Sequence, residues 1–167
     1  MGSHGSGAES AAVMVALRRI VRFLRLADRE AEAANGLSAA QLYVLHVLVD
    51  SPASSLAEIA ARTMTDQSSV STVVAKLVAR RLVTRKTAGA DRRRTELRLT
   101  PAGHRIILAS PQVPQTLIVD AVRAMARTRR LELVRGLENL SAAIGANAVA
   151  PRMLFEDEPA RKRRNRT

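Results

Sequence analysis

The sequence of 167 residues contains no cysteine and no tryptophan, and it has only one tyrosine and two phenylalanines. The absence of cysteine excludes disulfide bonds and thiol-based redox sensing. Because 47% of the residues are hydrophobic but so few are aromatic, the core must consist mainly of Ala, Leu, Val and Ile. No apolar run is long enough to span a bilayer, and the N-terminus lacks the apolar core of a signal peptide, so we expect a cytoplasmic protein.

Acidic residues are also scarce, since 15 Asp and Glu face 27 Lys and Arg, which gives a formal net charge of +12. An excess of this size indicates a polyanionic partner, nucleic acid ahead of an anionic membrane surface. A basic surface that only aids solubility is the simpler alternative. Residues 80–98 argue against it, because eight positive and two negative side chains there give +6, half of the total.

Residues 65–100 contain the motifs that predict the fold. Between residues 66 and 79, apolar side chains recur at spacings of three and four, which predicts a helix with one buried face. The opposite face carries short or polar side chains, namely Gln67, Ser68, Ser71, Thr72 and Lys76. Two β-prone runs follow, over 82–86 and 95–98, with turn residues between them. A polar-faced helix followed by a cationic hairpin is the order of a winged helix-turn-helix.

Two capping boxes mark the helices that precede this stretch. Ser38 with Gln41 predicts the start of a helix that runs to about Asp50, and Ser55 with Glu58 predicts a short helix over 56–63. A turn at 64–65 joins the short helix to the polar-faced one. Any helical protein contains such pairs, so the hairpin carries most of the weight in this prediction.

Amphipathic helices flank the winged unit. Residues 11–34 carry an apolar stripe and, on another face, a stripe of arginines. Such a helix can also be a membrane-surface or calmodulin-type segment, although packing against another helix is the favoured interpretation. A further helix is expected to start at Thr100-Pro101 and to kink or split at Pro111 and Pro114. Another helix is expected from about 115 to 126. The last one is expected to be capped by Thr128 and to run to about 146.

The apolar stripes of these outer helices exceed what a small domain can cover. We therefore predict a homodimer. The predicted interface residues are Leu17, Leu24, Leu131, Leu137 and Leu140. Burial of the stripes inside one chain is the alternative.

The predicted fold class is mostly α with a small β-hairpin wing. Residues 1–10 are interpreted as a disordered expression-tag remnant, 11–36 as an N-terminal dimerisation helix, and 37–100 as the winged helix-turn-helix lobe. Residues 101–147 are predicted to form C-terminal dimerisation helices, and 148–167 a basic disordered tail, which either adds phosphate affinity or is simply solvated.

The motifs of the winged unit resemble the MarR family of transcription regulators. The matching elements are Leu37-Ser38-x-x-Gln41-Leu42, the run 56–60, the stretch 66–83, and the wing signature Asp91-x-Arg93-x-x-x-Leu97-x-Leu99-Thr100-x-x-Gly103. The resemblance extends over about residues 11–144, and its most specific part is the wing signature. It implies a homodimer, held by its N- and C-terminal helices, that binds a palindromic operator in double-stranded DNA.

The resemblance also implies roles for the wing residues. Asp91 would hold an arginine that enters the minor groove, with Arg93 at the matching position and Arg92 or Arg94 on neighbouring phosphates. The alternative for Asp91 is a plain turn residue. The alternative for each arginine is a solvated charge without a DNA contact.

Side-chain chemistry suggests how the polar-faced helix would read DNA. Gln67 can form two hydrogen bonds to adenine, and the hydroxyls of Ser68, Ser71 and Thr72 can reach phosphates or base edges. Lys76, one turn later, suits a phosphate. Hydroxyls in the middle of a helix can instead bond to their own backbone.

Many MarR relatives respond to small phenolic or lipophilic ligands in a crevice between the dimer helices and the winged lobe. Tyr43, His46 and His104 are expected near such a crevice, although a histidine that is satisfied internally or lies on the surface is the commoner case. No cofactor and no metal site are predicted, because the needed ligands are absent or sparse.

The predicted function is therefore a DNA-binding transcriptional regulator, most often a repressor in this family, which a small-molecule effector can release. The alternative is a nonspecific nucleic-acid-binding protein of the nucleoid type, or an interaction module, on the same fold. Only the regulator would keep a large ratio of specific to nonspecific affinity. An enzyme is not expected, because the sequence has no cysteine, few histidines, no phosphate-binding glycine loop and no nucleophile elbow.

Overall fold

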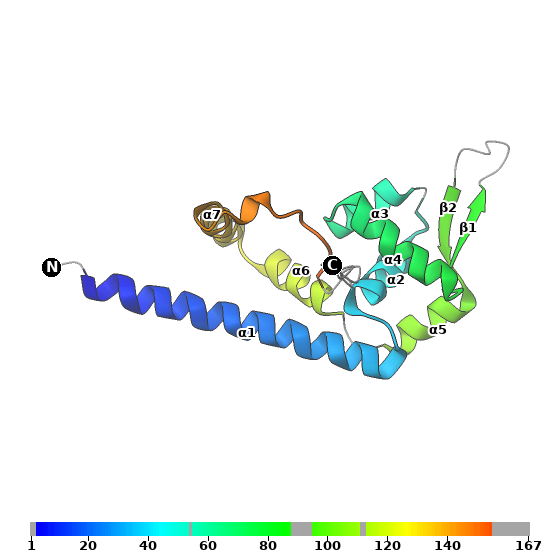
Figure 1. Cartoon of the computed structure of the whole chain (residues 1–167), viewed down its shortest axis with the longest axis horizontal. Coiled ribbons are helices and arrows are strands. Elements are labelled where there is room, and N and C mark those ends of the chain that lie inside the picture. Colours follow the sequence, from blue (N-terminus) through cyan, green and yellow to red (C-terminus); the bar gives the residue numbers. More distant parts are fainter. Residues whose placement is uncertain (1–2, 54, 88–94, 111–112, 155–167) are drawn as a thin grey trace, which may run out of the picture.

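The computed structural model describes residues 3–53, 55–87, 95–110 and 113–154. The elements are, in order, α1 (Ser3–Asn35), α2 (Ala39–Asp50), α3 (Leu56–Thr63), α4 (Gln67–Ala79), β1 (Val83–Thr87), β2 (Thr95–Leu99), α5 (Pro101–Ala109), α6 (Pro114–Ala124), α7 (Arg127–Ala143) and the 3-10 turn η1 (Ala146–Ala148) (Figure 1). The predicted fold class is confirmed, since the described chain is mostly helical and β1 pairs with β2 in an antiparallel hairpin.

The elements divide into a lobe and a long helical extension (Figure 1). Helix α1 runs along one edge of the molecule, and the lobe of α2 to α5 with the hairpin lies at its C-terminal end. Helix α6 leads back beside α1, and α7 stands apart from the lobe. This arrangement leaves the hairpin and α4 at one end of the molecule and the N-terminal half of α1 at the other.

The core of the lobe is built around α2, whose predicted inward residues Leu42, Leu45 and Leu48 are all buried. Side chains from α3, α4 and the hairpin complete it, and the fully buried ones include Ile59, Val70, Val74, Leu77, Val83 and Leu97. Burial of such aliphatic side chains supplies most of the favourable free energy of folding. The core therefore supports α4 along its buried face.

Local capping explains where α2 and α3 begin and how α2 ends. The Ser38–Gln41 capping box is present in full, because each residue's backbone N–H donates to the other's side chain, at 3.4 and 3.0 Å. The Ser55 hydroxyl accepts the Glu58 N–H at 3.1 Å. Arg62 donates to the carbonyls of Ser51 (2.8 Å) and Pro52 (3.2 Å), which follow α2. The guanidinium thus ties α3 to the end of α2.

The base of the wing is joined to α5 through Thr100 and Gly103. The Thr100 N–H donates to the Leu82 carbonyl at 3.0 Å, and its hydroxyl accepts the Gly103 N–H at 3.0 Å. A Cβ on Gly103 would lie 2.4 Å from the Leu82 oxygen. The Leu-x-Leu-Thr-x-x-Gly signature is therefore a packing device that fixes the wing on α5.

Three predictions about the outer segments differ from the structure. Residues 3–10 lie in α1, which begins at Ser3, whereas a disordered remnant was expected over 1–10. Thr128 lies inside α7, since the carbonyl of Ala126 accepts the Arg130 N–H and the helix begins at Arg127. Met153 is buried and its N–H donates to the Ser69 hydroxyl, and the Leu154 carbonyl accepts from Gln115, whereas a disordered tail was expected from 148. Residues 155–167 are outside the described part.

Candidate nucleic-acid interface

The turn between α3 and α4 sets the direction of the polar-faced helix. Met64 adopts the left-handed conformation (φ 56°) that commonly ends a helix. The Thr63 hydroxyl donates to the Ile59 carbonyl at 2.8 Å and lies 2.7 Å from the Thr65 hydroxyl. These hydroxyl contacts hold the turn in one shape, so α4 leaves it at a defined angle to α3.

Asp66 caps the N-terminus of α4. Its carboxylate accepts the Ser69 N–H at 2.9 Å and the Ser68 hydroxyl at 2.5 Å. The hydrogen bond from the Ser68 hydroxyl, followed by that from the Ser69 backbone, lowers the pKa of Asp66. The cap is therefore charged at neutral pH, and in the free protein the Ser68 hydroxyl is already engaged with it.

The two faces of α4 have the predicted character. The buried face is formed by Ser69, Val70, Val73, Val74 and Leu77. Of the predicted DNA-contacting side chains, Gln67, Ser68 and Thr72 are exposed, and Ser71 and Lys76 are half-buried. The Thr72 hydroxyl donates to the Ser68 carbonyl at 3.2 Å, which is the alternative considered for hydroxyls within a helix. The hydroxyl of Ser69 instead accepts the N–H of Met153 at 3.1 Å.

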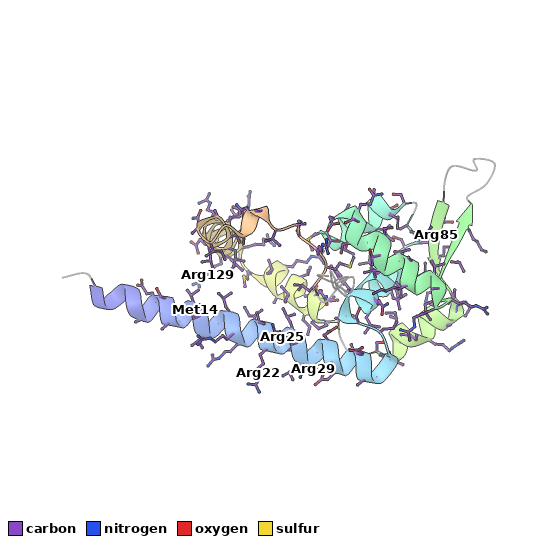
Figure 2. All side chains as sticks on the ribbon, viewed as in Figure 1. Met14, Arg22, Arg25, Arg29, Arg85 and Arg129 are labelled. Atoms are coloured by element: carbon purple, nitrogen blue, oxygen red, sulfur yellow. The ribbon has the colours of Figure 1, made fainter. Side chains whose placement is uncertain are left out.

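The wing continues the exposed surface beside α4. Arg85 and Lys86 of β1 are exposed, and Figure 2 shows Arg85 at the hairpin. Arg98 of β2 pairs with Glu96 through two hydrogen bonds, at 2.8 and 3.0 Å, and this pairing raises the pKa of Arg98. The sequence analysis did not propose Arg85 and Lys86 as DNA contacts. Their position in the predicted first strand of a cationic hairpin was the signal that could have identified them. Asp91, Arg92, Arg93 and Arg94 lie outside the described residues.

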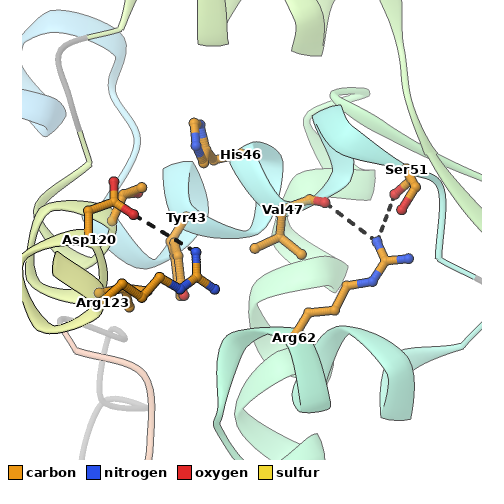
Figure 3. Close-up of a pocket in the computed structure, with 9 residues that line it drawn as sticks. Tyr43, His46, Val47, Ser51, Arg62, Asp120 and Arg123 are labelled. Atoms are coloured by element: carbon orange, nitrogen blue, oxygen red, sulfur yellow. Dashed lines mark hydrogen bonds and ion pairs between the residues drawn. The ribbon is translucent and has the colours of Figure 1, made fainter. Parts of the chain in front are cut away.

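A cleft of about 430 Å³ opens between α2, α3 and α6 (Figure 3). Its lining consists of Tyr43, His46, Val47, Ser51, Arg62, Thr116, Val119, Asp120 and Arg123. Arg62 is held there by backbone carbonyls, whereas the guanidinium of Arg123 lies 3.9 Å from the Asp120 carboxylate. Burial raises the pKa of the Tyr43 hydroxyl, and nearby Arg123 partly offsets that effect.

The structure brings two of the three predicted ligand residues to this cleft. Tyr43 and His46 both line it, from α2 (Figure 3). His104 does not line it and is exposed on α5. Sequence reasoning did not identify Arg123 or Asp120, because nothing in the local pattern shows that α6 lies against α2.

The residues predicted for the dimer interface differ in exposure. Leu131 and Leu137 of α7 are 45% and 49% exposed, and Leu17 and Leu140 are half-buried. Leu24 is only 6% exposed within the single chain, so its side chain is already covered and does not offer a surface to a partner. Further exposed apolar side chains on α1 include Met14, Ile20, Phe23 and Leu26.

Two other kinds of site are absent from the described ranges. No group of three or more His, Cys, Asp or Glu residues is placed to hold a metal ion there. Among the helices of the described segments, none has the length and hydropathy needed to cross a membrane.

Comparison with known families and proteins agrees with the geometry of the lobe. A model of the MarR family matches residues 35–94, which span α2, the helix-turn-helix and the start of the wing. No match was found among curated proteins.

Solved structures with the same fold are transcriptional regulators. BpsR of Bordetella bronchiseptica is 28% identical, with 77% of this chain and 92% of that chain covered and a TM-score of 0.52; its DNA binding is regulated by 6-hydroxynicotinic acid. Sco3205 of Streptomyces coelicolor, a MarR family regulator solved in complex with DNA, is 21% identical, with 87% and 94% covered and a TM-score of 0.56. BldR of Sulfolobus solfataricus is 24% identical, with 81% and 96% covered and a TM-score of 0.53.

The family match covers the segment that carries the helix-turn-helix, and the shared fold extends over most of the chain. Together they show that residues 35–94 match the MarR family and that the chain has the winged helix-turn-helix fold of MarR transcriptional regulators.

Proposed function

We propose that the chain is a homodimeric repressor that acts in the cytoplasm, binds a palindromic operator sequence-specifically and is released by a small molecule. The observation that carries this proposal is the exposed polar face of α4 beside the cationic strand β1. Helix α4 is supported along its opposite face by the core, so it can enter the major groove without rearrangement.

The side chains of this surface divide into two kinds of contact. Gln67, in the first turn of α4, is placed to read a base edge, and the exposed Thr72 lies further along the same helix. Arg85 and Lys86 of the wing supply phosphate contacts, which set the register but not the sequence preference. The relative Sco3205, which was solved with DNA, supports DNA as the partner of this fold.

The exposed apolar faces of α1 and α7 support a dimer. None of the α7 residues, all of which are described, is buried, although the helix carries several large apolar side chains. Soluble monomers seldom leave a surface of this kind uncovered. Packing against a second copy would bury these faces and would place two copies of α4 on successive half-sites of an operator.

The cleft between α2 and α6 suits a small effector. Tyr43 and His46 offer hydrogen-bonding groups, and Arg123 offers a cation in the lining, so we propose a small carboxylate-bearing molecule as ligand. BpsR, whose DNA binding responds to 6-hydroxynicotinic acid, supports this choice.

Selection of duplex DNA from a random pool at several salt concentrations tests the regulator against a nonspecific nucleic-acid-binding module. We expect a pseudo-palindrome with half-sites about one helical turn apart, and its advantage over random DNA should persist as salt rises. Enrichment of no sequence, with affinity that falls smoothly with salt, would contradict the proposal. Sedimentation of the selected complex then reports whether two chains bind each site.

A further inference from the structure

Helix α1 carries a row of arginines on the side that points away from the lobe. Ala31 is packed into the core of the lobe, and Leu24 is buried as well. At about 100° per residue, the centre of the row is turned by roughly 140° from these two side chains. Figure 2 shows Arg22 on the edge of α1 opposite to the lobe. The row consists of Arg18, Arg22, Arg25 and Arg29.

The charge of this row is not neutralised by neighbouring acids. All four side chains are exposed, and none of them forms a hydrogen bond or an ion pair with another residue in the described part of the chain. The sequence has no acidic residue between Glu9 and Asp28. Asp28 itself accepts the N–H of Ala39 at 2.8 Å, so it is committed to the start of α2. An exposed row of cations without counter-charges attracts a polyanion.

A groove of about 550 Å³ follows the row. Because no second element closes it, the groove suits an elongated partner rather than a small enclosed ligand. The rise from the first arginine to the last is roughly 16 Å, a length over which a DNA duplex presents several phosphates. Every residue of the lining comes from α1, namely the four arginines with Met14, Leu17, Val21 and Leu26.

The arrangement of apolar residues favours DNA over an anionic membrane. A helix that lies in a membrane surface turns one continuous apolar face to the lipid. In α1 the arginines interrupt the exposed apolar residues, with Val21 on one side of the row and Leu26 on the other, and the face that contains Leu24 is covered. The phosphates of a duplex, in contrast, pair with guanidinium groups directly.

Neither a second copy of the chain nor an operator needs this row. The exposed side chains of Ile20 and Phe23 lie on the side of α1 opposite to the row, so a partner that packs there leaves the arginines open. The wing lies elsewhere, since Figure 2 shows Arg85 far from Arg22 and Arg29. A duplex bound by α4 and β1 therefore leaves the row of the same chain free.

We propose that the arginine row of α1 is a second DNA-binding surface, which holds a separate duplex through its phosphates and without sequence preference. Each arginine that pairs with a phosphate releases condensed counterions, so the affinity falls steeply with salt. The proposal rests on the proposed function only for DNA as the partner, and it requires neither operator reading nor dimerisation. With both surfaces in use, one protein bridges two segments of DNA.

Methyl resonances of isotopically labelled methionines in the full chain locate the bound duplex, and the probe is a short duplex of scrambled sequence. Met14 lines the groove, whereas Met64 is 65% exposed at the turn between α3 and α4 and reports contact with the lobe. The duplex should shift Met14, and the slope of log affinity against log salt at this residue should be about −3.6 for four phosphate contacts. Operator duplex, added first until Met64 is saturated, should leave Met14 able to respond to the scrambled duplex.

A double variant in the middle of the row tests the assignment. Arg22→Gln combined with Arg25→Gln should lower the affinity reported by Met14 roughly tenfold and reduce the slope to about −1.8, because two phosphate contacts are lost. The response of Met64 should persist, since the lobe is unaltered.

The matched control removes the same charge from other helices. Arg105→Gln on α5 combined with Arg129→Gln on α7 changes two exposed arginines and should leave the titration at Met14 unaltered. The proposal is overturned if Met14 does not shift at low salt, if the variant in the row binds as tightly as the wild type, or if the control loses affinity equally. Saturation of Met14 by the operator alone, or its perturbation by anionic lipid vesicles at a lower concentration of charge than the duplex needs, would also overturn it.

Failure of the operator function gives a different result. A protein that binds all sequences alike would contradict the proposed regulator, but Met14 would still shift with the scrambled duplex and lose that response in the double variant of the row.

Discussion

At the scale of single residues, the first turn of α4 combines a structural task with a chemical one. Asp66 holds the turn by accepting from Ser68 and Ser69, and Gln67 next to it is exposed. The capping bonds satisfy backbone N–H groups that the helix itself cannot satisfy. Gln67 is therefore presented from a helix end with little freedom to unwind.

The lowered pKa of Asp66 makes the stability of this turn depend on pH. Because the pKa is lower in the folded state, the ionised carboxylate favours folding, and its contribution is complete well above the pKa of the unfolded chain. The contribution is lost as the pH falls below about 4. Asp66→Ala should lower the melting temperature by roughly 2–4 °C at pH 7 and by less at pH 3.

Asp66→Asn serves as the control in the same thermal melts, since Asn also caps helices but does not titrate. It should retain most of the stability at pH 7. A loss in Asp66→Ala that is independent of pH would contradict the role of the charged cap.

Gln67 and Lys86 should affect operator binding in different ways. If Gln67 reads a base, Gln67→Ala costs about 1–3 kcal/mol on the operator and relaxes discrimination at one position. Lys86→Ala, which removes a phosphate contact, should weaken binding to all sequences alike and reduce the salt dependence by about one charge. Fluorescence anisotropy with operator and scrambled duplexes at several salt concentrations distinguishes the two patterns.

At the scale of elements, the wing owes its position to the contact between α5 and the hairpin base. Thr100 bonds to the carbonyl of Leu82 from one side, and the bare Cα of Gly103 lies against the same carbonyl. Neither contact requires the residues at the wing tip. The orientation of the hairpin relative to α4 is thus decided at its base.

Gly103→Ala should destabilise the fold by about 1–3 kcal/mol, because the new Cβ would force the backbone of Leu82 or α5 to move. Gly136→Ala is the matched control, because it lies within α7 and, apart from its chain neighbours and the backbone of its own helix, no described atom is within 4 Å of the added Cβ. The change should stabilise by about 0.5–1 kcal/mol. Denaturant unfolding of both variants measures the two effects. Equal stabilities would contradict the packing role of Gly103.

At the scale of the whole molecule, the cations of the wing and most of the exposed apolar side chains lie on different elements. Figure 2 shows Arg85 on the wing far from Arg22, Arg25 and Arg29 on α1, where these arginines lie beside apolar side chains such as Leu26. Exposed apolar side chains instead concentrate on α1 and α7, away from the lobe. This separation allows dimer contacts and operator contacts to be altered independently.

The dimer proposed from these faces predicts the behaviour of two leucine variants. Leu137→Arg, on α7, should convert the dimer to a monomer and remove the avidity for two half-sites. Leu108→Arg changes a leucine that is 87% exposed on α5 and should leave the dimer intact. Analytical ultracentrifugation measures both. A Leu137→Arg protein that still sediments as a dimer would show that the interface lies elsewhere.

Local sequence signals predicted most of the lobe. The capping residues Ser38, Ser55, Asp66 and Thr100 all accept the backbone N–H expected of a cap, because capping depends only on neighbours three residues away. The buried and exposed faces of α4 also follow from its periodicity. Thr128 is the exception, since a threonine near a helix start does not compel the chain to begin the helix there.

Contacts between distant segments were beyond such reasoning. Leu24 shares a stripe with Leu17, yet only the folded chain covers it, and His104 lies away from the cleft that receives Tyr43 and His46. By itself, the sequence determined the order of the helices, the position of the hairpin and the basic character of the wing, because periodicity, caps and charge act locally. Only the tertiary structure decided that Met153 would lie against Ser69 and that α6 would face α2, because the packing of elements distant in sequence depends on the shape of the whole core.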